Sequence, residues 1–118
     1  MKSFLICLSL ALTSPTHAQN CLSLPAKFAS YSEAITTIQK AKFKVMESAN
    51  TSNSSWITSA KYYSCDGALG YFIYSTNRNY QYIHAKVPIL IWTEFKAAPS
   101  KGSYYNRIIR GKYRLILN

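Results

Sequence analysis

Acidic side chains are scarce in this sequence of 118 residues. Four aspartates and glutamates stand against fourteen lysines and arginines, and only two histidines accompany them. A zinc site needs three or four converging Cys, His or carboxylate ligands, and general acid–base catalysis draws on the same residue types. Glycine-rich phosphate loops and nucleophile elbows are missing as well. We therefore expect a protein that is not an enzyme and that holds no metal and no cofactor.

Long apolar runs are also missing, apart from a short one at the start of the chain. It extends from Phe4 to Leu12 behind the cation Lys2, and Pro15 and Ala18 follow it. Nine residues cannot cross a hydrocarbon core that requires about 20. The layout is typical of a secretory signal peptide. We expect cleavage near Ala18 and an exported protein, periplasmic or secreted, rather than a buried helix, a membrane anchor or a lipoprotein.

Cysteine is rare, with three residues in the whole chain. Cys7 lies within the expected signal peptide, so export leaves Cys21 and Cys65. An even pair in an exported chain indicates one disulfide, which would tie the N-terminal segment to the middle of the domain. Two unpaired buried thiols are the alternative. About 100 residues remain after cleavage, enough for one compact domain.

The pattern of apolar residues predicts an α+β fold. Residues 31–42 have helical spacing, with Glu33 in the first turn, and residues 43–47 alternate as a possible edge strand. Residues 56–65, 69–76 and 79–87 are rich in aromatic and β-branched side chains and are separated by turn residues, which predicts three consecutive antiparallel strands.

A helix is expected to begin at Pro88 and to stop at Pro99, and residues 112–117 alternate as a last strand. The expected architecture is a small antiparallel sheet of three to four strands, a meander plus a C-terminal strand. A helix follows the third strand, and a further helix is added at the N-terminus. Tyr71 and Ile73 oppose Phe72 and Tyr74, so neither side of the sheet is polar and we expect both faces to be covered.

The order of these features resembles the KTSC domain family, a small domain also found at the C-terminus of some lysyl-tRNA synthetases. The resemblance covers roughly residues 54 to 114. The residues that carry it are Ser54, Ser55, Ile57, Tyr80, Gln81, Tyr82, Val87, Pro88, Ala98, Ser100, Gly102, Tyr105, Asn106, Ile109, Lys112 and Tyr113. The chain departs from the family pattern by inserting Pro99 and by adding an N-terminal segment that contains a cysteine.

Together with the signal pattern and the cysteine pair, this resemblance predicts three parts: a signal peptide (1–18), an N-terminal helical extension tied by a disulfide (19–53) and a KTSC-like domain (54–118). Because the domain occurs in the same chain as some lysyl-tRNA synthetases, the resemblance implies RNA binding. Such a function transfers poorly to a protein that leaves the cytoplasm.

One catalytic arrangement is formally possible, because a serine could join His84 and Asp66. Asp66 precedes Gly67 in a turn, however, where an aspartate ordinarily binds the backbone. His84 alternates with Tyr80 and Tyr82 along one strand, and we expect it to be a polar residue on the strand surface.

The net charge of +10 favours an anionic partner. We expect a binding module whose basic, tyrosine-rich face meets an acidic protein or an anionic envelope component, since Tyr and Arg make good interface anchors. The candidate binding residues are Tyr80, Tyr82, Lys101, Arg107, Arg110, Lys112 and Arg114. Nucleic acid is the alternative partner, because tyrosines interleaved with cations suit single strands. A solvated basic surface without a partner also remains open, and docking on an anionic membrane or lipopolysaccharide is less favoured because no amphipathic basic helix is evident.

Overall fold

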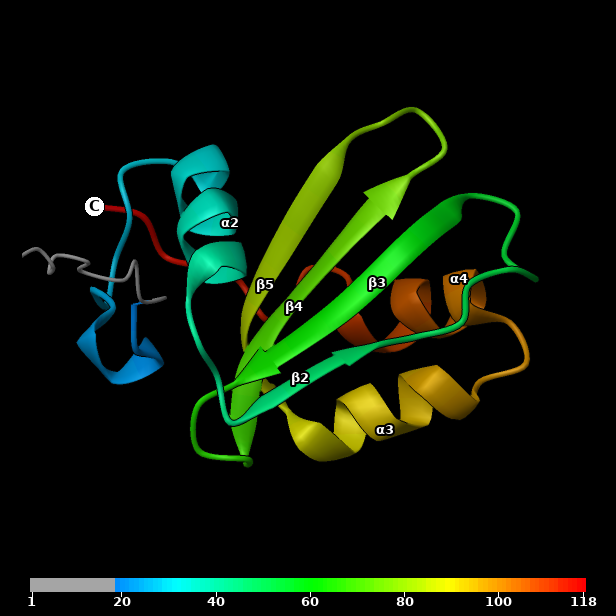
Figure 1. The fold of residues 1–118 in the computed structure, drawn as a ribbon. Helices are drawn as coiled ribbons and strands as arrows, with labels where there is room; N and C mark the ends of the chain where they lie inside the picture. The colour runs from blue at the N-terminus through cyan, green and yellow to red at the C-terminus, as the bar shows by residue number, and fades with distance from the viewer. Residues whose placement is uncertain (1–18) are drawn as a thin grey trace, which may run out of the picture.

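The computed structural model describes residues 19–118 and contains a four-stranded antiparallel sheet with helices on both faces (Figure 1). The strands lie in the order β2 (Val45–Ser48), β3 (Ile57–Ser64), β4 (Leu69–Thr76) and β5 (Gln81–Pro88). The α+β fold and the meander of three long strands are confirmed. The expected signal peptide at residues 1–18 lies outside the described residues.

The N-terminal extension forms a 3-10 turn, η1 (Cys21–Ser23), and the helix α2 (Tyr31–Lys40). Ser30 caps α2, since its hydroxyl accepts a hydrogen bond from the backbone N–H of Glu33, 3.0 Å away. The Glu33 carboxylate in turn accepts a hydrogen bond from the N–H of Ala29, 2.9 Å away. This reciprocal arrangement differs from a capping box only in that Glu33 binds the N–H one residue before the N-cap, and it satisfies two backbone donors at the start of the helix.

Three helical segments follow the sheet in sequence, and they cover the face opposite α2 (Figure 1). Helix α3 (Ile89–Ala97) begins directly after Pro88, which is the N-cap residue and has an extended backbone with φ of −62° and ψ of 145°. The short helix α4 (Lys101–Tyr104) is capped by the hydroxyl of Ser100, which accepts a hydrogen bond from the N–H of Ser103. The π-helix η2 (Tyr105–Ile109) continues α4 without a break.

Successive side chains along the strands point to opposite faces of the sheet and pack into two separate apolar cores. Phe72 and Tyr74 of β4 point toward α3, α4 and η2, where they pack with residues such as Trp92 and Tyr105. Ile73, between them, points to the opposite face and packs with the buried face of α2 and with residues from both chain ends. The expectation of a sheet covered on both faces is confirmed, because a strand buried on both sides needs apolar residues at every position.

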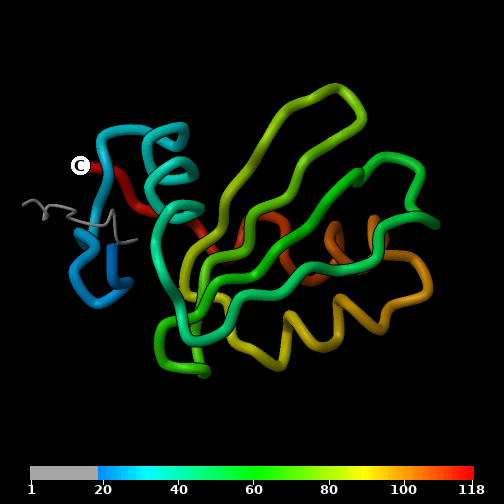
Figure 2. Tube along the Cα trace, viewed as in Figure 1, coloured from blue at the N-terminus to red at the C-terminus, as the bar shows by residue number. Residues whose placement is uncertain are grey.

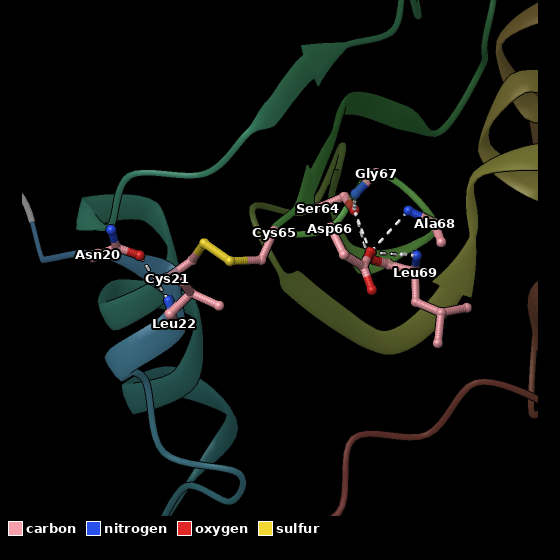
Figure 3. The surroundings of a disulfide bond; sticks show 9 residues. All are labelled: Asn20, Cys21, Leu22, Ser64, Cys65, Asp66, Gly67, Ala68 and Leu69. Atoms are coloured by element: carbon pink, nitrogen blue, oxygen red, sulfur yellow. Dashed lines mark hydrogen bonds between the residues drawn. A yellow bond between two sulfur atoms is a disulfide. The ribbon is translucent and has the colours of Figure 1, made fainter.

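The disulfide between Cys21 and Cys65 fastens the extension to the turn between β3 and β4 (Figure 3). The two Cα atoms are 5.9 Å apart, at a sequence separation of 44 residues. In the same turn the Asp66 carboxylate accepts hydrogen bonds from the N–H groups of Ala68 and Leu69. Asp66 therefore has the turn-forming role expected from its place beside a glycine.

The C-terminal segment differs from the expected last strand. Residues 112–117 make only isolated bridges, in which Arg114 pairs with His84 and Leu117 with Phe28. The segment runs from the edge of β5 toward the extension on the α2 side of the sheet (Figure 2), so its backbone bonds are divided between two neighbours. The fourth strand is instead β2, in the place where a possible edge strand was predicted.

Candidate binding groove

The helical segment after α3 carries most of the candidate cations. Tyr105 and Ile109 are buried, whereas Asn106, Arg107 and Arg110 are exposed. The wide π-helical turn is closed by a hydrogen bond from the Arg110 N–H to the Tyr105 carbonyl, 2.9 Å away. Because the buried tyrosine anchors this segment in the core, the two arginines stand on its outer side.

These cations line a groove made of three adjoining pockets, hereafter the basic groove. The first pocket, of about 390 Å³, is lined by Arg114, Tyr82 and Tyr105 among others. Tyr82 and Tyr105 also line the second, of about 340 Å³, together with Arg110. The second shares residues Trp56 and Asn106 with the third, of about 460 Å³, which Arg107 and Lys101 line. The linings of these three pockets, which share residues in pairs, together contain four cations.

Aromatic rings stand among these cations. Tyr82 is 45% exposed and packs its other face against Tyr74, with ring centroids 5.2 Å apart. Trp56 meets Tyr74 and Tyr105 edge-on at 6.1 and 5.9 Å and is itself half-buried. Rings fixed by such contacts lose little conformational freedom when they bind a partner, which favours them as anchors.

Arg107 and Lys101 are each held by a neighbour of the same segment. The Arg107 guanidinium lies over the ring of Tyr104, 5.9 Å from its centroid. The Lys101 ammonium donates a hydrogen bond to the carbonyl of Ala98, 3.2 Å away. Both interactions leave the charge uncompensated, because neither partner is an acid.

A buried polar chain supports the groove from below. The Nε2 atom of His84 lies 2.9 Å from the Tyr105 hydroxyl, which accepts a hydrogen bond from the Tyr74 hydroxyl, 2.8 Å away. The prediction that His84 is a surface residue is wrong, since it is only 9% exposed. C-terminal residues cover the outer edge of β5, which the strand pattern alone did not indicate, and the His84 Nδ1 atom lies 3.1 Å from the carbonyl oxygen of Tyr113.

Burial sets the protonation of this chain. It lowers the pKa of His84, although the hydrogen bond to the Tyr113 carbonyl acts in the opposite direction. It also raises the pKa of both Tyr74 and Tyr105, an effect that the nearby positive charge of Arg110 opposes in each case. The side chains of His84, Tyr105 and Tyr74 are therefore neutral at pH 7, and the positive charge of this region belongs to the cations of the groove.

Each of the four acids of the chain has a hydrogen-bond partner other than a groove cation. Glu33 caps α2 and Asp66 holds its turn. Glu47 binds the Lys96 ammonium at 2.6 Å and accepts a hydrogen bond from the Trp92 indole N–H at 2.8 Å. Glu94 accepts a hydrogen bond from the Tyr104 hydroxyl at 2.7 Å. The Lys96–Glu47 contact is the only ion pair within residues 19–118. Within residues 19–118, no acid thus lies within 4 Å of a groove cation, and the nearest link is Glu94, which binds the hydroxyl of the Tyr104 ring beneath Arg107.

The structure brings most of the predicted binding residues together. Tyr82, Lys101, Arg107, Arg110 and Arg114 line the groove, whereas Tyr80 and Lys112 do not. Tyr80 is exposed, with its ring 6.5 Å from that of Tyr82. The sequence pattern did not place Trp56, Asn106 or Tyr105 in the site. Trp56 lies 26 residues before Tyr82, and the family resemblance assigns Tyr105 and Asn106 to the scaffold. Within residues 19–118, no cluster of three or more metal-ligating side chains occurs, and no helix there is long and apolar enough to span a membrane.

The protein is a small α+β domain in which the sheet and the helical segment after α3 together form the basic groove. The model of the KTSC domain family matches residues 53–113, which is 61 of 118 residues, and the chain belongs to this family. A crystal structure of a KTSC domain protein from Yersinia pestis is similar at 28% sequence identity and a TM-score of 0.50. The similarity covers 61% of this chain and 99% of that chain. No curated protein matches the chain.

Proposed function

We propose that this KTSC domain protein is an exported, non-enzymatic binding module, and that its basic groove binds an acidic segment of a protein partner or envelope component. The observation that carries the proposal is the row of four groove cations without an acidic partner within residues 19–118. An anionic ligand would supply the missing counter-charge, and complementary charge speeds association and fixes the register of binding.

The aromatic residues of the groove support the same proposal. Tyr82 and Trp56 offer rigid contact area beside Arg110 and Arg107, and aromatic and arginine side chains contribute most to protein interfaces.

An acidic peptide tests the proposal directly. We expect a fluorescent glutamate-rich peptide to bind the wild-type protein and to bind the variant Arg107→Glu/Arg110→Glu at least about tenfold more weakly. Lys40→Glu/Lys61→Glu is the matched control, because it changes the charge equally at two exposed cations outside the groove. Equal loss in both double variants would mean that net charge, and not the groove, attracts the peptide.

A pull-down from envelope extract extends the test to natural partners. The bait is the wild-type protein, compared with a charge reversal at Arg107, Arg110, Lys112 and Arg114. Identical partner sets from the two baits would reject the groove as an interface.

Single-stranded nucleic acid is the second candidate ligand, favoured by one observation. The exposed ring of Tyr82 lies in the pocket that Arg110 lines, so that a base could stack where a phosphate meets a cation. Binding through four phosphates would weaken log-linearly with salt, with a slope of roughly −3. An oligonucleotide that shows no binding at low salt would eliminate this candidate.

Export is part of the proposal and has its own measurement. Mass spectrometry of the protein produced from the full-length gene, with and without reductant before alkylation, reports the cleavage site and the disulfide together. We expect cleavage near Ala18 and alkylation of Cys21 and Cys65 only after reduction. An uncleaved cytoplasmic protein with free thiols would favour the nucleic-acid candidate instead.

A further inference from the structure

A second, more apolar pocket lies beside the disulfide on the face of the sheet that α2 covers. It has a volume of about 590 Å³, within the range of roughly 300 to 1,000 Å³ that is common for small-molecule sites. Cys21 and Cys65 both line it, as do residues of the extension, of β4 and β5 and of the C-terminal segment. We call it the disulfide pocket. The matched family region does not contain the extension, so that region alone does not form this pocket.

The floor of the disulfide pocket is apolar. Phe43 and Leu115 are buried there, and Tyr71 meets Phe43 edge-on with ring centroids 6.2 Å apart. Leu69 and Ile116 line the same pocket yet are 44% and 60% exposed. Figure 3 shows Leu69 at the end of the turn that holds Cys65. Large apolar side chains left open to water around a buried apolar floor form a surface on which a hydrocarbon chain would gain free energy.

Cations surround this apolar floor. Lys27, Lys86 and Arg114 line the pocket, are exposed, and have no acidic partner within 4 Å among residues 19–118. The one acid of the lining, Asp66, is committed to its turn through the N–H groups of Ala68 and Leu69, and these hydrogen bonds lower its pKa. Three cations and one carboxylate leave the lining with a net charge of +2.

The backbone of β5 helps to place one of these cations. Phe72 pairs with His84 and Gly70 with Val87, so β5 has one residue more than β4 in this stretch. Lys86 lies in this bulge with φ of 55°, a conformation that is uncommon for a residue other than glycine. Bulges redirect side chains, and they recur beside functional sites.

We propose that the disulfide pocket binds a single-chain anionic amphiphile with the chemistry of a long-chain fatty acid. The hydrocarbon chain lies over Phe43, Tyr71 and Leu115, and the carboxylate lies among Lys27, Lys86 and Arg114. Charge complementarity selects an acid over a neutral lipid, and the apolar floor selects a long chain over a short one. This inference does not depend on the function proposed for the basic groove.

Ligand comparison tests the proposal without any mutation. Binding of dodecanoate, hexanoate and methyl dodecanoate is measured below their aggregation limits by displacement of a fluorescent fatty acid, with protein produced from the full-length gene. Dodecanoate binds; hexanoate binds about a hundredfold more weakly or worse, because six buried CH₂ groups are missing. Methyl dodecanoate binds about fivefold more weakly, because it carries no charge. Absence of dodecanoate binding, or equal affinity for the ester, overturns the proposal.

Two variants locate the site. Lys27→Gln/Lys86→Asn removes two of the cations, and asparagine tolerates the positive φ at position 86. This double variant weakens dodecanoate binding about fivefold, whereas the control Lys40→Gln/Lys61→Gln leaves it unchanged. Ala26→Trp, on the exposed rim, fills the pocket and abolishes binding. Unchanged binding in both pocket variants overturns the proposal.

The basic groove provides the internal comparison. Arg107→Glu/Arg110→Glu retains dodecanoate binding, since neither residue lines the disulfide pocket. Arg114 lines both sites and is therefore left intact in every variant of this experiment. Dodecanoate binding that is lost with the groove arginines, and not with Lys27 and Lys86, assigns the amphiphile to the groove and overturns the proposal.

Discussion

The Nε2 atom of His84 lies 2.9 Å from the hydroxyl oxygen of Tyr105, and both groups are buried beneath the basic groove. The Nδ1 atom faces the carbonyl oxygen of Tyr113, which can only accept a hydrogen bond. Nδ1 therefore carries the proton, Nε2 accepts from the Tyr105 hydroxyl, and that hydroxyl accepts from Tyr74. One histidine tautomer thus satisfies each of these polar contacts and fixes the π-helix against β4 and β5.

The first prediction concerns stability against acid. Burial lowers the pKa of His84 in the folded protein below its ordinary value of 6.5. As the pH falls through that ordinary value, the unfolded chain binds a proton that the folded protein does not, so the free energy of unfolding decreases. We expect the melting temperature to fall between pH 7 and pH 5.

His84→Gln supplies the comparison for this prediction, because glutamine keeps a polar side chain that does not titrate. Its melting temperature is expected to change much less over the same range. The same pH dependence in wild type and variant would contradict the assignment to His84.

The second prediction concerns the shared hydroxyl. Tyr105→Phe removes it and leaves His84 Nε2 and the Tyr74 hydroxyl without a partner in a buried site. We expect the free energy of unfolding in urea to decrease by about 1 to 3 kcal/mol. Tyr80→Phe, at a residue 58% exposed, is the control and is expected to have little effect. Equal values for the two variants would argue against a structural role for the polar chain.

The third prediction concerns Gly102, which lies against the indole of Trp56. A β-carbon on Gly102 would overlap the Trp56 Nε1 atom. Alanine ordinarily stabilises a helix relative to glycine by about 1 kcal/mol. At this position we expect the opposite, a loss of about 1 to 3 kcal/mol, because the tryptophan must move.

The matched control for Gly102→Ala is Gly111→Asn. Gly111 has φ of 77° and open space around it, so asparagine is tolerated there. Tryptophan fluorescence is expected to change with Gly102→Ala alone, because the substitution moves Trp56 within the groove. An unshifted spectrum and unchanged stability would mean that the space at Gly102 is larger than the structure shows.

The fourth prediction concerns the disulfide. Replacing Cys21 and Cys65 by serine opens a loop of about 45 residues, and the chain-entropy model gives a loss of about 4 kcal/mol. We expect the denaturant midpoint to fall accordingly, and reduction of the wild type to have the same effect. A double variant as stable as the oxidised protein would show that the extension is held by its apolar contacts alone.

Local sequence patterns determined most of the secondary structure. Two strong turns, at Asp66–Gly67 and at 77–79, fix the meander, and Pro88 and Pro99 bound the helix after it. Hydrogen bonds in turns and helix ends are made by residues close in sequence, so their signals are readable without the fold. The disulfide joins residues 44 positions apart, and it could be predicted because only two cysteines remain after the expected signal peptide.

The tertiary structure decided what these elements surround. Contacts between residues far apart in sequence bury His84, join Trp56 to Arg107 and Arg110 in one groove, and assemble the disulfide pocket from both chain ends and the sheet. Strand pattern predicts only which of two faces a side chain takes, and not what the rest of the chain lays over that face. By itself the sequence determined a stapled, basic α+β domain, and packing over long sequence distances decided where its charges and rings meet.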